Sequence, residues 1–337
     1  MARIFVMGAG GFGTALAVMA HDLGHTLTIW SPFAQEVDQL NTAREHQKLL
    51  KGVKIAEDIA ITTSLENVPN QDLVILATPS SAVRQTAQKL AAHIRPETPV
   101  VCVSKGLEAG SYKPLSDVLE EELPKGSQVM LSGPSHAEEV ARGVPTTVVA
   151  ASRNRAAAEY VQDTLGGGNL RIYVSDDVLG VELGGALKNV IALAAGILDG
   201  LEAGDNTKAA LMTRGIAEIA RLGVALGAKS ETFAGLSGIG DLIVTCASMH
   251  SRNRRCGILI GQGMEPAKAV EEIGMTVEGY GCSKIAWELS RRHSIVMPIV
   301  EQVYAVLYEG KNPQEAVSDL MKRPSRHESE AIWLLSR

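Results

Sequence analysis

The sequence of 337 residues predicts an α/β fold, in which an N-terminal, doubly wound, mostly parallel sheet precedes an all-helical second domain. Short apolar, β-branched runs alternate with helical patterns in the first half of the chain. A glycine-rich loop directly follows the first run, and strong strand runs cease near Asp176. We place the domains at residues 1–178 and 179–337, because a chain of this length favours two hydrophobic cores.

The predicted strands are continuous apolar runs without polar alternation, as expected of strands buried on both faces. Helical patterns lie between them, for example at residues 13–23 and 82–93, and the sheet is expected to extend to about residue 175. The junction has no flexible linker composition, so we expect the domains to pack together around a ligand cleft. The runs are Ile4–Val6, Leu27–Ile29, Leu73–Leu76, Val100–Val103, Val129–Leu131 and Thr146–Val149.

Composition argues against several classes of protein. A net charge of −6 and an aromatic content of 4% disfavour nucleic acid as a partner. The four cysteines are scattered without C-x-x-C spacing, so we expect reduced thiols and no metal site. The longest apolar run, Val190–Leu198, is too short to span a bilayer, and no leader pattern precedes the first strand. We therefore expect a cytoplasmic protein with no integral membrane segment.

The glycine-rich loop after the first strand fits G-x-G-x-x-G and predicts a dinucleotide, NAD or NADP, as cofactor. Gly8 permits a tight turn, Gly10 lets the backbone approach a pyrophosphate, and Gly13 allows close packing of helix on strand. The following helix directs free N–H groups toward the phosphates. The second strand ends in residues 30–33, Trp-Ser-Pro-Phe, which hold neither a carboxylate for the ribose nor an arginine for a 2′-phosphate. The choice between NAD and NADP therefore stays open.

Polar residues stand at three further places where apolar ones are expected. Lys105 follows a buried strand and is expected at the carboxyl edge of the sheet, where open α/β folds bind ligands. The alternative is that Lys105 is a loop lysine in contact with solvent and has no role in binding. The turn at residues 132–137 lies at the same edge of the sheet, where it either binds a ligand or serves only as a structural turn. Lys188 lies in an apolar helix, where burial lowers an ammonium pKa and favours a neutral base. The alternative is a lysine that reaches the surface or pairs with a carboxylate.

Two segments of the second domain add polar groups. Asp241 follows a glycine-rich turn and either takes part in chemistry or caps a helix. Ser251, Arg252 and Asn253 begin an apolar helix, where Arg252 is suited to grip a phosphate. Three arginines occur within residues 252–255, and we expect one or two of them on a solvated face.

Seven motifs occur in an order that is more specific than any one of them: Gly8–Ala17, Val103–Leu107, Leu131–Ala137, Ala186–Asn189, Leu236–Leu242, Ser251–Asn253 and Val277–Tyr280. Together they resemble the bacterial type of soluble glycerol-3-phosphate dehydrogenase acting on NAD or NADP, over nearly the whole chain. The resemblance implies a Rossmann domain, a helical domain like the C-terminal domain of 6-phosphogluconate dehydrogenase, and a homodimer. It also implies interconversion of glycerol 3-phosphate and dihydroxyacetone phosphate, supplying glycerol 3-phosphate for phospholipid synthesis.

The resemblance further implies individual roles. Lys188 is implied to accept the proton of the substrate C2 hydroxyl, Lys105 to contact cofactor and substrate, and Asp241 to orient Lys188. The substrate site is implied to comprise Lys105, Gly133, Ser135, Lys188, Asp241, Ser251, Arg252 and Asn253. The implied dinucleotide site comprises Gly8, Gly10, Gly11, Phe12, Gly13, Lys105, Ala137, Arg252, Thr276 and Glu278.

Departures from the family pattern bear mostly on the cofactor. Gly11 and Phe12 replace a common Ser-Tyr pair, and Pro32 stands where His or Arg is frequent, so the resemblance leaves the choice between NAD and NADP open. One alternative is a β-hydroxyacid dehydrogenase, although such enzymes separate lysine and asparagine by a helical turn, whereas Lys188 and Asn189 are adjacent. The other is a sensor that binds the dinucleotide without turnover.

Overall fold

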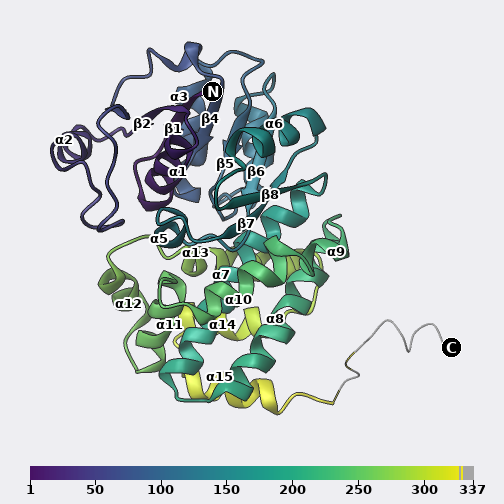
Figure 1. Ribbon diagram of the computed structural model, residues 1–337. Helices are drawn as coiled ribbons and strands as arrows, with labels where there is room; N and C mark the ends of the chain where they lie inside the picture. Colours follow the sequence, from purple (N-terminus) through teal and green to yellow (C-terminus); the bar gives the residue numbers. More distant parts are fainter. Residues whose placement is uncertain (326–327, 329–337) are drawn as a thin grey trace.

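The computed structural model describes residues 1–325 and 328, so the last part of the predicted second domain, 326–327 and 329–337, lies outside the described residues. An α/β half and a helical half are stacked on each other (Figure 1). The predicted division after residue 178 remains a prediction; the long helix α7 (Val178–Gly200) begins at that position.

An eight-stranded sheet forms the first half of the protein, in the order β3-β2-β1-β4-β5-β6-β7-β8. All neighbouring strands are parallel except the antiparallel pair β6 and β7, so the predicted mostly parallel sheet is confirmed. The strand order reverses at β1, which pairs with β2 and β4; ligands bind at such a switch point in open α/β sheets. The strands are β1 (Arg3–Met7), β2 (Thr26–Trp30), β3 (Ala60–Thr62), β4 (Leu73–Leu76), β5 (Val100–Cys102), β6 (Gln128–Ser132), β7 (Thr146–Ala151) and β8 (Leu170–Ser175).

Two strands, β3 and β8, lack the apolar run by which the others were predicted. β3 is only three residues long. β8 is an edge strand whose side chains alternate between buried and exposed, with Tyr173 46% exposed. A strand with one face in solvent has alternating polar and apolar residues, and this pattern predicts a strand less clearly than a continuous apolar run does.

Helices cover both faces of the sheet. Apolar side chains of α1, α2, α5 and α6 share one core with the sheet, while α3, α4 and the start of α7 share the other. The helices of this half are α1 (Gly11–Asp22), α2 (Ala34–Ala43), η1 (Val68–Asn70), η2 (Ser80–Ala82), α3 (Val83–Ala91), α4 (Leu115–Glu122), α5 (Ala137–Val140) and α6 (Arg155–Leu165).

The second half is built around α7, whose sequence is apolar on nearly every side. Helix α7 is long and apolar enough to cross a membrane, but it is buried inside the protein along that stretch, as a core helix is. Gly196 and Gly257 let α7 and α11 touch, since a Cβ on Gly196 would lie 2.0 Å from the Arg254 carbonyl oxygen. The remaining helices are α8 (Asp205–Ala225), α9 (Ser230–Phe233), η3 (Leu236–Gly240), α10 (Asp241–Ala247), α11 (Arg252–Gly261), α12 (Pro266–Ile273), α13 (Glu278–Arg292), α14 (Pro298–Tyr308) and α15 (Pro313–Met321).

Candidate active site

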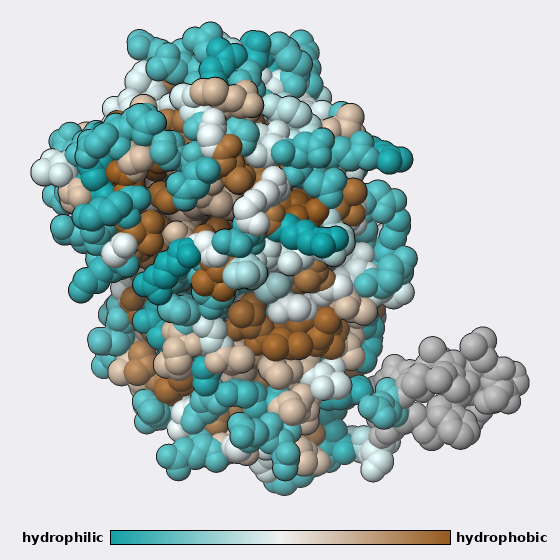
Figure 2. Space-filling view, in the orientation of Figure 1, coloured by the Kyte–Doolittle hydropathy of each residue, from teal (hydrophilic) through white to brown (hydrophobic). Residues whose placement is uncertain are grey.

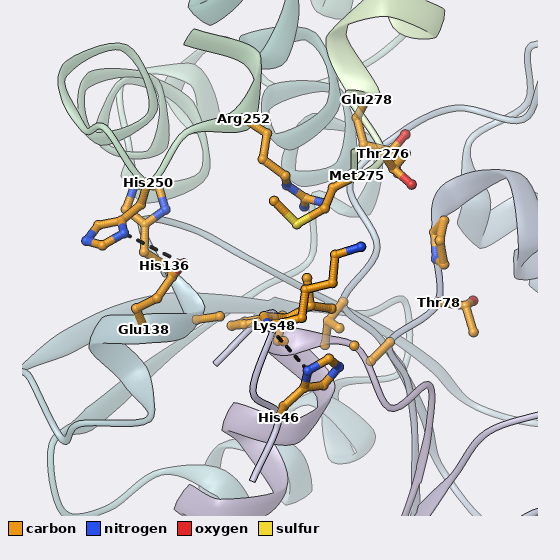
Figure 3. A pocket seen from close by; sticks show the side chains of 18 of the residues that line it. His46, Lys48, Thr78, His136, Glu138, His250, Arg252, Met275, Thr276 and Glu278 are labelled. Carbon is orange, nitrogen blue, oxygen red and sulfur yellow. Dashed lines mark hydrogen bonds and ion pairs between the residues drawn. The ribbon is translucent and has the colours of Figure 1, made fainter. Parts of the chain in front are cut away.

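A cavity of about 1540 Å³ lies between the two halves and is lined by residues of both. Figure 2 shows hydrophobic side chains gathered along the middle of the visible face, while its upper end is mostly hydrophilic. The predicted site residues line this cavity except Gly8, Gly13 and Gly133, which are not among its lining residues. Arg252, Thr276 and Glu278 project from the helical half, opposite Lys48 of the sheet half (Figure 3).

The loop between β1 and α1 has the shape that a pyrophosphate requires. Gly8 has a φ of +122°, and a Cβ there would lie 2.6 Å from the Ala77 carbonyl oxygen. A Cβ on Gly13 would lie 2.1 Å from the Gly8 carbonyl oxygen. At Gly10, by contrast, a Cβ would meet nothing within 4 Å, and no side chain caps the start of α1. Open backbone beside a helix N-terminus fits a dinucleotide phosphate, so these residues fit the predicted cofactor.

Lys188 projects from the middle of α7 and is 5% exposed. Its Nζ donates to Asp241 Oδ1 and to Thr245 Oγ1, both at 2.6 Å. Burial lowers the pKa of Lys188 to about 8; the Asp241 carboxylate opposes this shift and the Lys105 ammonium adds to it. An amine with this pKa exchanges a proton readily near neutral pH.

Asp241 joins two lysines that lie far apart in the sequence. Its Oδ2 accepts from Lys105 Nζ at 2.7 Å, while its Oδ1 accepts from Lys188. The side chain is 2% exposed. Burial disfavours the charged carboxylate, but the two ammonium groups outweigh it and hold the pKa of Asp241 below its usual value. Although Asp241 begins α10, its carboxylate pairs with the lysines, and no side-chain cap bond is present at this helix start.

Lys105 connects this ion pair to the sheet. It follows β5, and its Nζ also donates to the Gly133 carbonyl oxygen at 2.8 Å. Ser135 Oγ donates to the same oxygen at 3.0 Å. The loops after β5 and β6 therefore meet at the carboxyl edge of the sheet, with Ser135 facing the cavity.

Two glycines on α7 explain how these loops approach the buried lysine. A Cβ on Gly184 would lie 2.5 Å from the Ser237 carbonyl oxygen, and one on Gly185 would lie 2.6 Å from Ser132 Oγ. The turn η3, a single π-helical turn, thus packs directly on α7 and delivers Asp241 to Lys188. Larger residues at 184 or 185 would separate the groups.

The start of α11 forms another wall of the cavity. Ser251 caps the helix, its Oγ accepting from the Arg254 N–H. Asn253 accepts from the Gly279 N–H at 2.8 Å and donates to Asn189 Oδ1 at 2.9 Å, which ties α11 to α13 and α7.

The three arginines of α11 differ in their surroundings. Arg252 and Arg255 line the cavity. Arg254 pairs instead with Asp199, at 2.7 Å, and donates to the Ala247 carbonyl oxygen. This pairing holds the start of α11 against the end of α7. Arg254 and Arg255 are half-buried, whereas Arg252 is exposed, so the expectation that one or two of the arginines face solvent is confirmed for Arg252.

Glu278, at the start of α13, bridges to the sheet half. Its carboxylate accepts from the Ser80 N–H at 3.1 Å and from Ser80 Oγ at 2.6 Å. Gly106 makes room for this contact, because a Cβ there would lie 2.5 Å from Ser80 Cβ. The bridge lies beside Lys105 and joins the two walls of the cavity.

Thr245 was not singled out from the sequence, although its hydroxyl contacts Lys188. Thr245 Oγ1 also donates to the Asp241 carbonyl oxygen at 2.6 Å. The available signal was its spacing, because residues four apart share a helix face and Thr245 follows Asp241 by four. A threonine in a helix commonly bonds its own backbone, so this spacing alone does not indicate a site.

The comparisons with known proteins agree over the whole chain. The family model described as "NAD-dependent glycerol-3-phosphate dehydrogenase N-terminus" matches residues 3–158, and the model of the C-terminus matches residues 177–318. A relative from Desulfitobacterium hafniense (strain Y51), named glycerol-3-phosphate dehydrogenase [NAD(P)+], is 52% identical over 336 residues, which are 100% of this chain and 96% of the relative. One of the same name from Thermoanaerobacter sp. (strain X514) is 52% identical over 98% of this chain and 100% of its own length.

Solved structures show the same architecture. The crystal structure of glycerol-3-phosphate dehydrogenase from Coxiella burnetii matches with a TM-score of 0.91 and 36% identity, covering 96% of this chain and 99% of that one. D-mandelate dehydrogenase, at a TM-score of 0.64 and 16% identity, covers 94% of this chain and 99% of its own and shares the fold alone.

Proposed function

Since the chain belongs to the NAD-dependent glycerol-3-phosphate dehydrogenase family, we propose that it is an NAD(P)-dependent oxidoreductase that interconverts glycerol 3-phosphate and dihydroxyacetone phosphate. The observation that carries the proposal is the cluster of the buried Lys188 and Asp241 with the half-buried Lys105, which opens onto a cavity that begins at the glycine-rich loop. The named relatives support this hypothesis, and not the β-hydroxyacid dehydrogenase or the sensor without turnover.

Lys188 is the proton-transfer group of this proposal. A bound nicotinamide supplies the hydride acceptor for alcohol oxidation, or the hydride donor for ketone reduction. In oxidation, neutral Lys188 takes the C2 hydroxyl proton while the C2–H bond gives up its hydride and the C–O bond becomes a carbonyl. In reduction, the Lys188 ammonium returns that proton to the oxygen. Asp241 and Thr245 fix Nζ in one position for both directions.

Lys105 and Arg252 supply positive charge at two ends of the substrate. Lys105, which pairs with Asp241 at 2.7 Å, stabilises the negative charge that grows on the substrate oxygen. Arg252 lines the cavity at the start of α11, where a planar guanidinium and helix N–H groups suit a phosphate. Holding the phosphate there fixes the distance from it to the reacting carbon. Glu278 and Thr276 complete the wall of the proposed cofactor site.

The assay that tests the proposal follows the near-ultraviolet absorbance of reduced nicotinamide. Purified protein is mixed with NADH or NADPH and dihydroxyacetone phosphate; parallel reactions contain dihydroxyacetone or a short 3-oxo acid in place of the phosphorylated ketone. We expect rapid loss of absorbance only with the phosphorylated ketone. Reaction with the oxo acid alone would favour the β-hydroxyacid dehydrogenase, and tight cofactor binding without any reaction would favour the sensor.

We also propose that the protein acts as a cytoplasmic homodimer whose product supplies phospholipid synthesis. The acidic balance of the chain and the burial of its most apolar helix, α7, are compatible with this setting. Light scattering coupled to gel filtration tests the homodimer, for which a monomeric mass would be the contradicting result. Depletion of the protein in its host is expected to lower the glycerol 3-phosphate pool.

A further inference from the structure

A carboxylate from the following helix, α2, lies at the end of β2, where the strand's own residues include no acid. Residues 31–33 contain no acid, but Glu36, in the first turn of α2, folds back so that its Oε2 accepts from Ser31 Oγ at 2.5 Å. The strand end lies beside the glycine-rich loop, because the Gly8 N–H donates to the Trp30 carbonyl oxygen at 2.9 Å. Glu36 therefore supplies the acid at the point where a Rossmann domain meets the adenosine ribose.

Ser31, Pro32 and Phe33 offer no free backbone or hydroxyl donor there. The Ser31 N–H donates to the Thr62 carbonyl oxygen, Pro32 has no N–H, and the Phe33 N–H donates to Ser31 Oγ. The one proton of the Ser31 hydroxyl goes to Glu36. A ribose hydroxyl needs an acceptor, which Glu36 provides, whereas a 2′-phosphate needs donors and positive charge.

The groups around Glu36 leave its charge largely uncompensated. Glu36 lines the cavity with a side chain that is 32% exposed. His46 Nε2 lies 3.9 Å from Oε1, but burial lowers the pKa of His46, which disfavours a cation beside this carboxylate. Lys48 is the cation in the same wall of the cavity and is the group most able to serve a 2′-phosphate (Figure 3). Phe33 is 66% exposed at the cavity and offers an apolar face to an adenine.

We propose that Glu36, held by Ser31, binds the adenosine ribose and excludes a 2′-phosphate, so that the protein prefers NAD(H) over NADP(H). The inference rests on the proposed function only in assuming that the cavity binds a nicotinamide dinucleotide. It names Glu36 as the residue that determines cofactor specificity. A dianionic 2′-phosphate beside this carboxylate is disfavoured by repulsion, whereas a neutral hydroxyl donates to it.

Binding measured without substrate tests the proposal. Titration calorimetry compares NADH with NADPH, and 5′-AMP with 2′,5′-ADP, which isolate the adenosine end. We expect the wild-type protein to bind NADH about tenfold or more tightly than NADPH. In Glu36→Gln the ratio is expected to fall toward unity, mainly because NADPH binds more tightly. The matched control is Asp38→Asn, which removes an acid from the same helix and cavity wall and is expected to leave the ratio unchanged.

Three results would overturn the inference: equal or tighter binding of NADPH by the wild-type protein, an unchanged ratio in Glu36→Gln, or an equal change in Asp38→Asn. Lys48→Met provides a further check, because a selective loss of NADPH binding in this variant would show that Lys48 serves a 2′-phosphate. Failure of the two proposals is distinguishable. A protein that prefers NADH but does not reduce dihydroxyacetone phosphate contradicts only the proposed reaction, and one that reduces it equally with both cofactors contradicts only the role of Glu36.

Discussion

The ammonium nitrogen of Lys188 lies 2.6 Å from Asp241 Oδ1, and both side chains are almost completely buried. The second oxygen of Asp241 is engaged by Lys105, so one carboxylate faces two cations. Two like charges this close to each other repel, and the carboxylate between the buried Lys188 and the half-buried Lys105 makes their proximity possible. The arrangement places Lys105 and Lys188, whose pKa burial lowers to about 8, on the two oxygens of one carboxylate at one end of the cavity.

Asp241→Asn is expected to destabilise the protein by about 3–5 kcal/mol, because it leaves the buried ammonium group of Lys188 without its counter-charge. It is also expected to lower the pKa of Lys188 further, since the attraction that favours the charged amine is lost. Urea denaturation measures the first effect. The control is Asp176→Asn, which breaks an exposed ion pair with Lys229 and is expected to change stability little. Equal stability of the two variants would contradict the claim that Asp241 supplies the counter-charge on which the buried lysine depends.

Thr245→Val keeps the shape of the side chain but removes the oxygen that accepts from Lys188. One buried N–H bond of Lys188 is then unsatisfied, which costs about 1–3 kcal/mol. We expect kcat to fall about tenfold or more while KM for the substrate changes little, because Thr245 acts on the base and not on the phosphate. Thr245→Ser is expected to restore kcat. A matching loss in both variants would indicate packing and not the hydroxyl.

The rate is expected to depend on pH in opposite senses in the two directions. Burial places the pKa of Lys188 at about 8, well below its usual 10.5. Alcohol oxidation needs the neutral amine, so its kcat should rise with pH and level off above about 8. Ketone reduction needs the ammonium, so its kcat should be highest below about 8 and fall above it. The role of Lys188 as the proton-transfer group would be contradicted if kcat in the two directions did not change in opposite senses with midpoints near this pH.

Gly10→Ala separates cofactor binding from folding. A Cβ at Gly10 meets nothing within 4 Å, and its φ of −66° suits any residue, so we expect no loss of stability. The added methyl occupies space proposed for the pyrophosphate, and NADH binding is expected to weaken about tenfold or more. Gly281→Ala, in an open position on α13, is the control and is expected to stabilise the helix by up to about 1 kcal/mol without affecting NADH. Equal NADH affinity in the two variants would show that the glycine-rich loop does not contact the cofactor.

Some of this architecture is predictable because its signals are local. The apolar strand runs, the glycine-rich loop beside β1 and the apolar surroundings of Lys188 each occupy a short stretch of sequence. The contact of Lys188 with Asp241 joins residues 53 positions apart, and no local pattern specifies it. Glu36 was missed as a possible ribose acid because it lies in the first turn of α2, beyond the strand end where an acid is usually sought.

The central claim is that Lys188 transfers the proton, and the comparison of cofactor binding with turnover in Lys188→Ala tests it most directly. Dissociation constants for NADH are measured by calorimetry, and single-turnover reduction of dihydroxyacetone phosphate is followed by loss of reduced-nicotinamide absorbance. Loss of an acid–base group predicts unchanged NADH binding and a turnover rate lower by about 10²- to 10⁴-fold. A variant that binds NADH normally and turns over at the wild-type rate would contradict the account.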